Sequence, residues 1–135
     1  MKVLGFSLIE LLVVLAIAST LVALVGPASY RSIERARTQT ELVAIQRWYD
    51  RMGYNAFIRG ESVRVEWKSP QTIVAISDNE LVGEKNTQFV TADYQGYVVF
   101  TPAGIPSRSQ ISLVDQSGRG FDLTLAGSLS LRSAY

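Results

Sequence analysis

The fold of this chain is decided near its N-terminus by GFSLIELLVVLAI, residues 5–17. This stretch begins an apolar run from Phe6 to Val25 that is interrupted by four residues: Ser7, Glu10, Ser19 and Thr20. A helix needs about 20 mostly apolar residues to cross a hydrocarbon core of roughly 30 Å. The run therefore predicts a membrane-spanning helix over residues 6–26.

Glu10 is the one charged residue in this run. A carboxylate at the centre of a bilayer costs about 3 kcal/mol, and somewhat less near an end, so its presence indicates a function. The simplest structural role is local, because a carboxylate in the first turn is stabilised by the positive end of its own helix dipole.

Two simpler interpretations of the run remain open. A secretory signal has a basic start, a short apolar segment and a small-residue cleavage site. Lys2 and the alanine-rich stretch Ala16–Ala28 fit that pattern, whereas Glu10 inside the apolar segment argues against it. A plain single-pass anchor is the other interpretation. Charge counting leaves its orientation open, because Lys2 on one side faces three arginines on the other: Arg31, Arg35 and Arg37.

Composition excludes several classes of function. The 135 residues include no Cys and no His, so the chain has no disulfide, no thiol nucleophile and none of the commonest general bases and metal ligands. The net charge of +1 does not demand a nucleic-acid partner. No glycine-rich phosphate loop, metal-ligand spacing or nucleophile–base pair is present. We therefore expect no catalytic residues, metal site or cofactor, and the chain is not predicted to be an enzyme.

Beyond the apolar run the helical pattern becomes amphipathic over residues 27–53. One apolar stripe contains Ile33, Ala36, Thr40, Val43 and Ala44, and the adjacent stripe contains Leu42, Ile45, Tyr49 and Met52. Polar residues fall largely elsewhere: Arg35, Gln39, Gln46 and Asp50. Gly26 and Pro27 predict a bend, since proline removes a backbone hydrogen bond and clashes one turn back. Gly53 predicts the end of the helix, and Trp48 and Tyr49 are expected to pack in the core rather than stack on a ligand.

Residues 54–135 change to the period of β-strands. Val63, Val65 and Trp67 alternate with polar residues, which is typical of a half-buried strand. Further strands are expected over Thr72–Ile76, Gln88–Val90, Tyr97–Phe100, Ile111–Val114, Phe121–Leu125 and Ser128–Leu131, with turns at Thr101–Gly104, Asp115–Gly120 and Ala126–Gly127. One long helix followed by a run of strands predicts an α+β fold, with the helix packed on a small antiparallel sheet.

The N-terminal residues, GFSLIELLVVLAI, resemble the class III signal of type IV pilins and type II secretion pseudopilins. The resemblance implies that prepilin peptidase removes residues 1–5, cutting between Gly5 and Phe6, and methylates the new N-terminus. Glu10 then becomes the fifth residue of the mature chain. Its implied role is to neutralise the Phe6 amine of a neighbouring subunit and so set the axial register of a filament, where unpaired charges are strongly disfavoured. Pro27 falls where many pilins carry a helix-bending proline.

The C-terminal half resembles the heads of the H-type minor pseudopilins and of the FimT-like minor pilins. The resemblance is carried by FTPAG at 100–104, ISL at 111–113, DLTL at 122–125 and GSL at 127–129. Major pilins usually hold a Cys pair and major pseudopilins an acidic calcium loop near the C-terminus, and neither pattern is present. Asp78-Asn79-Glu80 lacks the ligand number and spacing of a calcium loop and is expected to be a solvated turn.

A DNA-uptake pilin is the alternative within this family. Arg108, Arg119 and Arg132 could contact DNA phosphates. FimT-like pilins share a Gly-Arg-x-Arg motif in the tail, whereas this chain has Gly127-Ser128-Leu129-Ser130 there, which argues against DNA binding.

Together these features predict a minor pseudopilin or minor type IV pilin. The resemblance implies a single-pass protein of the bacterial inner membrane with residues 54–135 as a periplasmic head. Its implied partners are other pilin or pseudopilin subunits, prepilin peptidase and secreted cargo.

Overall fold

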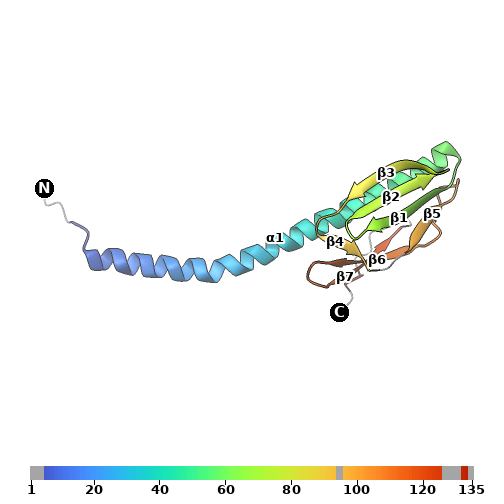
Figure 1. Cartoon of the computed structure of the whole chain (residues 1–135). Helices are drawn as coiled ribbons and strands as arrows, with labels where there is room; N and C mark the ends of the chain where they lie inside the picture. The colour runs from blue at the N-terminus through green and yellow to red at the C-terminus, as the bar shows by residue number, and fades with distance from the viewer. Residues whose placement is uncertain (1–4, 94–95, 126–131, 134–135) are drawn as a thin grey trace. The chain divides into compact units, whose positions relative to one another are not determined.

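The structure, a computed structural model, describes residues 5–93, 96–125 and 132–133 (Figure 1). The elements are α1 (Leu8–Arg59), β1 (Val63–Ser69), β2 (Thr72–Ser77), β3 (Glu80–Asn86), β4 (Val90–Ala92), β5 (Tyr97–Phe100), β6 (Gln110–Asp115), β7 (Gly120–Thr124) and β8 (Arg132–Ser133). One long helix followed by antiparallel strands confirms the expected α+β fold. The chain divides into two compact units, Met1–Ala36 and Arg37–Tyr135. We call the second unit the head.

Both ends of α1 have a local chemical cause. At the start, the Ser7 carbonyl accepts hydrogen bonds from the amides of Glu10 at 3.0 Å and Leu11 at 3.2 Å. At the end, Gly60 adopts a φ of 65°, which a residue without Cβ reaches at no steric cost. The Gly60 amide then donates to the Phe57 carbonyl and the Glu61 amide to the Ala56 carbonyl, each at 3.3 Å. This pair of hydrogen bonds is the Schellman motif that ends many helices.

The expected helix end at Gly53 is therefore wrong, because α1 continues for six residues beyond it to Arg59. Gly53 serves close packing instead. A Cβ built on it would lie 3.1 Å from the Phe100 ring and 3.3 Å from the Gly104 carbonyl oxygen. The helix is also continuous through Pro27. The bend expected at Gly26 and Pro27 stays a prediction.

The first sheet has the strand order β3-β2-β1-β5, with every neighbouring pair antiparallel. Its strands β1, β2 and β5 lie close to the ranges expected from sequence. Strand β3 was not expected. It is joined to β2 by Asp78 and Asn79, whose φ values of 50° and 67° are both positive. Two such residues form the tight type I′ turn that joins paired strands. The solvent-exposed turn expected at Asp78-Asn79-Glu80 is thus confirmed, and it joins β2 and β3 into a hairpin that was not expected.

The second sheet has the order β4-β6-β7-β8 and is also antiparallel. The head therefore holds two four-stranded sheets, where the sequence predicted one. The hairpin expected around residues 115–120 is confirmed, since Ile111 pairs with Leu123 and Leu113 with Phe121. The strand expected at Ser128–Leu131 and the turn at Ala126–Gly127 lie outside the described residues.

One hydrophobic core lies between the second part of α1 and the two sheets. The helix contributes the expected stripe of Leu42, Ile45, Tyr49 and Met52, each at most 3% exposed, together with Trp48 and Ala56. Core packing of Trp48 and Tyr49 is thus confirmed. The other expected stripe is not buried to the same degree: Ile33 is 51% exposed, and Ala36 and Thr40 are exposed as well. Gln46 was expected to face solvent but is 5% exposed.

Candidate functional site

The candidate site begins at the junction between the leader and α1. Gly5, Phe6 and Ser7 precede the first helical residue, Leu8, and Phe6 is 76% exposed. The Gly5–Phe6 peptide bond is therefore outside the helix and accessible, as a proteolytic site must be. Glu10 lies in the first turn of α1, where its amide already donates to Ser7.

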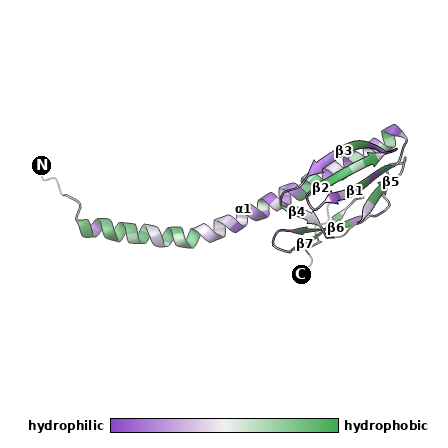
Figure 2. Cartoon of the chain, in the orientation of Figure 1, coloured by the Kyte–Doolittle hydropathy of each residue, from purple (hydrophilic) through white to green (hydrophobic). Residues whose placement is uncertain are grey.

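Phe6 and the first part of α1, most of which has the colour of hydrophobic residues in Figure 2, carry exposed apolar side chains. More than half of each large apolar side chain is exposed at thirteen positions: Phe6, Leu8, Ile9, Leu11, Leu12, Val13, Val14, Leu15, Ile17, Leu21, Val22, Leu24 and Val25. Within the described part of the chain, α1 is the one helix long and apolar enough to cross a membrane. Exposed apolar surface of this extent indicates a lipid or protein environment.

The polar side chains among these apolar residues differ in whether they have an interaction partner within the described residues. The Ser19 hydroxyl donates to the Leu15 carbonyl at 2.7 Å, and the Thr20 hydroxyl donates to the Ala16 carbonyl at 2.5 Å. Both hydroxyls therefore enter an apolar medium with their donors already used. Glu10 takes part in neither ion pair of the described residues, Arg64–Glu66 and Arg119–Asp115. It is the one charged side chain among the apolar residues 6–25.

Comparison with known proteins adds a family match at the same residues. Residues 1–26 match the family described as the prokaryotic N-terminal methylation motif. Searches of curated proteins and of solved structures gave no match. The motif supports a type IV pilin-like or pseudopilin subunit, which implies assembly with other pilin subunits and processing by prepilin peptidase. It also fits membrane anchoring through the apolar helix and points to a structural subunit rather than an enzyme.

The three arginines considered for DNA binding do not share one position on the second sheet. Arg108 precedes β6, whereas Arg119 lies in the connection from β6 to β7. The six residues of β6 separate these two by roughly 20 Å. Arg132 lies in β8 and pairs with Asp122 in the middle of the hairpin. The arrangement does not bring the three together, and DNA binding by them stays a prediction.

Arg119 is held by a buried carboxylate. Its guanidinium lies 2.6 Å from Asp115 Oδ2, and the Asp115 side chain is 3% exposed. Burial raises the pKa of Asp115, but hydrogen bonds from the Ser117 hydroxyl, the Arg119 amide, the Arg119 side chain and the Ser117 amide outweigh it and leave the pKa below its ordinary value. Asp115 and Arg119 therefore order the β6–β7 turn. The sequence analysis predicted the turn at Asp115–Gly120 but missed the role of Asp115 as its hydrogen-bond acceptor, for which an aspartate followed by Ser-Gly at 117–118 is a signal.

A second carboxylate, Glu41, joins the helix to the start of β4. It accepts three backbone hydrogen bonds, from Gln88 at 2.6 Å, Phe89 at 2.6 Å and Val90 at 2.8 Å. No sequence pattern predicts this contact, because its partners lie 47 to 49 residues further along the chain.

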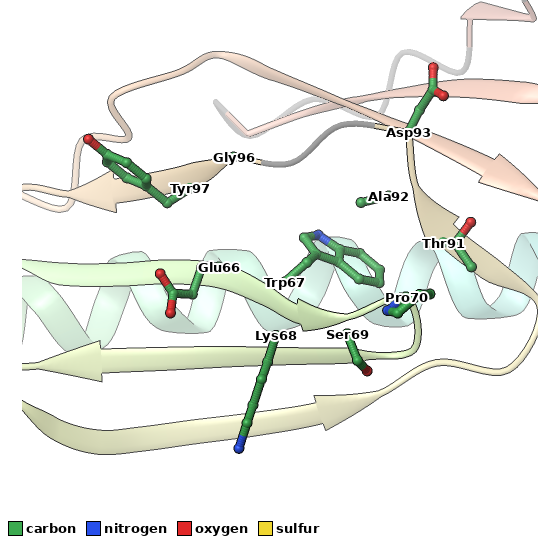
Figure 3. Close-up of a pocket in the computed structure, with 10 residues that line it drawn as sticks. All are labelled: Glu66, Trp67, Lys68, Ser69, Pro70, Thr91, Ala92, Asp93, Gly96 and Tyr97. Carbon is green, nitrogen blue, oxygen red and sulfur yellow. The ribbon is translucent and has the colours of Figure 1, made fainter.

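The head also contains an open cleft of about 860 Å³ beside Trp67 (Figure 3). It lies between the end of β1 and β4, where the register of β1 with β5 ends at the pair Glu66–Tyr97. The buried Trp67 indole nitrogen has no hydrogen-bond partner among the described residues. Glu66, Lys68 and Asp93 line the same cleft with opposing charges. Within the described ranges, no group of three or more Asp and Glu side chains could hold a metal ion.

Proposed function

We propose that this chain is the precursor of a minor pseudopilin or minor type IV pilin, a structural subunit of a filament that serves protein secretion or pilus assembly. The observation that carries the proposal is the match of residues 1–26 to the prokaryotic N-terminal methylation motif. It falls on an exposed apolar helix with a single carboxylate in its first turn.

In this proposal, prepilin peptidase cuts the accessible Gly5–Phe6 bond and methylates the new amine. Cleavage creates a cation at Phe6, four residues before Glu10. Such a cation and a carboxylate each lose hydration when apolar helices bundle, so each is disfavoured unless it meets a partner. Glu10 of one subunit and the Phe6 amine of its neighbour supply that pair, which favours one axial register over others.

The head has a separate role. We infer that it lies in the periplasm, anchored to the inner membrane by residues 6–26, until the subunit enters the filament. There it contacts other subunits or cargo. A minor rather than a major subunit is favoured because the chain has no Cys pair and no acidic calcium loop.

The intact mass of the full chain, extracted from membranes, tests the proposal. We expect a protein that begins at Phe6 and carries the mass of one added methyl group. A chain that retains Met1–Gly5, or one that begins well beyond Phe6, would identify a plain anchor or a secreted domain. The matched control is Gly5→Leu, which should leave the precursor uncut in the same membranes.

A further inference from the structure

The last turns of α1 carry an apolar patch that the head leaves uncovered. We define it as the tip patch: Tyr54, Phe57, Ile58 and Ile105, which are 62% to 63% exposed. Tyr54, Phe57 and Ile58 are three and four residues apart and so lie together on the helix. Ile105 follows Gly104, whose Cβ position lies 3.6 Å from the Phe57 Cβ. The patch thus joins the helix end to the connection after β5.

The exposed area of the tip patch indicates what kind of binding partner could cover it. Aromatic side chains carry 150–250 Å² each, so these four residues expose roughly 450 Å². That is about the size of the largest apolar patch on a typical monomer, which is often functional, but it is well below the roughly 800 Å² per partner of a stable independent complex. A contact of this size fits a partner that another interface already holds nearby, since tethering raises the effective concentration.

The surface beside the patch is hollowed. A depression of about 290 Å³ is lined by Tyr54, Phe57, Phe100, Ala103 and Gly104, with Asp50 and Leu125. Two residues of the tip patch, Tyr54 and Phe57, are among those that line it. A hollow of this size accepts one large side chain of a partner, which is the usual form of an interface anchor.

From these observations we propose that the tip patch is the head-to-head contact with an adjacent subunit of the same filament, which inserts a large apolar side chain beside Phe57. This inference rests on the proposed function, because the apolar helix supplies the first interface that holds the two subunits together. The exposed rings in the free chain are then buried only after assembly.

The first experiment uses the Tyr54→Ser, Phe57→Ser double variant of the full chain in cells that build the filament. We expect its content in sheared filaments to fall at least tenfold, with cleavage and membrane level equal to those of the wild type. Tyr97→Ser is the matched control, since Tyr97 is 50% exposed on β5 outside the patch. It should assemble normally. Unchanged fluorescence-detected unfolding of the extracted double variant excludes a folding defect.

The second experiment identifies the partner. Because the chain contains no Cys, Ile105→Cys gives one attachment point for a benzophenone photocrosslinker, with Glu84→Cys on β3 as the control. We expect an adduct with a filament subunit from position 105 alone.

The outcomes separate the two proposals. Normal incorporation of the double variant, or an adduct with a secreted protein instead of a subunit, overturns the inference and leaves the proposed function standing. A wild-type chain that keeps Met1–Gly5 and stays out of filaments overturns both.

Discussion

Two carboxylates of the head accept hydrogen bonds from backbone amides. Glu41 joins α1 to the start of β4 in this way, and Asp115, which also pairs with Arg119, orders the β6–β7 turn. Glu41 accepts three amide hydrogen bonds, and Asp115 accepts two amide hydrogen bonds in addition to those from side chains. By contrast, the Arg64–Glu66 pair at 3.3 Å joins two side chains that are 51% and 37% exposed. Ion pairs exposed to this degree contribute little to stability.

We expect Glu41→Gln to lower the free energy of unfolding by about 2 kcal/mol, since hydrogen bonds to a charged acceptor contribute about 1.5–3 kcal/mol each and the amide offers one oxygen for three donors. The measurement is urea unfolding of the detergent-solubilised chain at pH 7, followed by tryptophan fluorescence. Glu66→Gln is the matched control and should change the value by less than about 0.5 kcal/mol. Equal effects of the two variants would contradict this assignment.

The contribution of Asp115 to the stability of the folded head should depend on pH. Its pKa in the folded head lies below the ordinary value of 3.8, so the folded state favours the ionised form. The resulting stability is complete above the pKa of the unfolded chain and disappears as the pH falls through the folded pKa. We therefore expect Asp115→Asn to be destabilising from pH 7 down to about pH 5, and the difference from the wild type to narrow below about pH 4. Denaturant unfolding of both proteins across this pH range measures the difference in their free energies of unfolding. A difference that stays constant with pH would contradict the prediction.

The role of an individual residue could be predicted from sequence when its partners lie close to it in the chain. Glu10 stands out because its surroundings in sequence are apolar, and Asp115 could have been found from the turn it belongs to. Glu41 could not, since its role depends on how β4 packs against α1. The cleft beside Trp67 also depends on tertiary structure, because it requires β1 to extend past the last pair with β5.

At the scale of elements, the sequence placed the end of α1 at the wrong glycine. Gly53 was expected to end α1 but lies within it against Phe100, while Gly60 ends it with a positive φ. A polar residue follows each glycine within two positions, Asn55 after Gly53 and Glu61 after Gly60, so local composition does not distinguish a packing glycine from a terminating one.

Gly60→Ala should destabilise the head by about 1 kcal/mol, because a side chain disfavours the left-handed conformation that the Schellman motif needs. Space is not the cause, as no atom lies within 4 Å of the added Cβ. Gly120→Ala is the control: its Cβ also meets open space, and its φ is not positive. The measurement is the thermal unfolding midpoint of each variant, which should fall for Gly60→Ala and stay near the wild-type value for Gly120→Ala. A loss of stability of the same size for Gly120→Ala would refute the conformational argument.

The strands were predicted where apolar residues alternate and missed where they do not. Strand β3 contains Gly83, Glu84, Lys85 and Asn86, so its sequence reads as a loop. It forms because the Asp78-Asn79 turn places it beside β2, and Gly83 leaves room for Met52 and Trp48 at 3.3 and 3.5 Å from its Cβ position. A polar strand at the edge of a sheet is favoured by pairing with its neighbour more than by its own composition.

For the whole molecule, the α+β class followed from the change of periodicity after the helix, whereas the division of the head into two sheets did not. Strand order is set by contacts between segments far apart in the chain, such as Val63 with Phe100. The proposed assembly residues, Phe6 and Glu10, could be named from sequence because they lie within one continuous motif of the chain.

We expect Glu10→Ala to leave cleavage after Gly5 and membrane insertion intact, and to reduce incorporation into filaments by at least tenfold. The reason is that the neighbouring Phe6 amine would lose its counter-charge in an apolar bundle, where an unpaired charge costs about 3 kcal/mol or more. The measurement compares subunit content of sheared filaments with that of membranes. Wild-type incorporation by the alanine variant would show that Glu10 acts only on its own helix.

The thirteen bare apolar side chains of residues 6–25 also restrict the route that the molecule can take. Placing them in water would cost on the order of 20 kcal/mol, so a dissolved, isolated copy has no meaningful population. In the proposed filament, each copy therefore passes directly from the lipid bilayer into contact with other subunits, and subunits released from a broken filament should return to the bilayer rather than enter the aqueous phase.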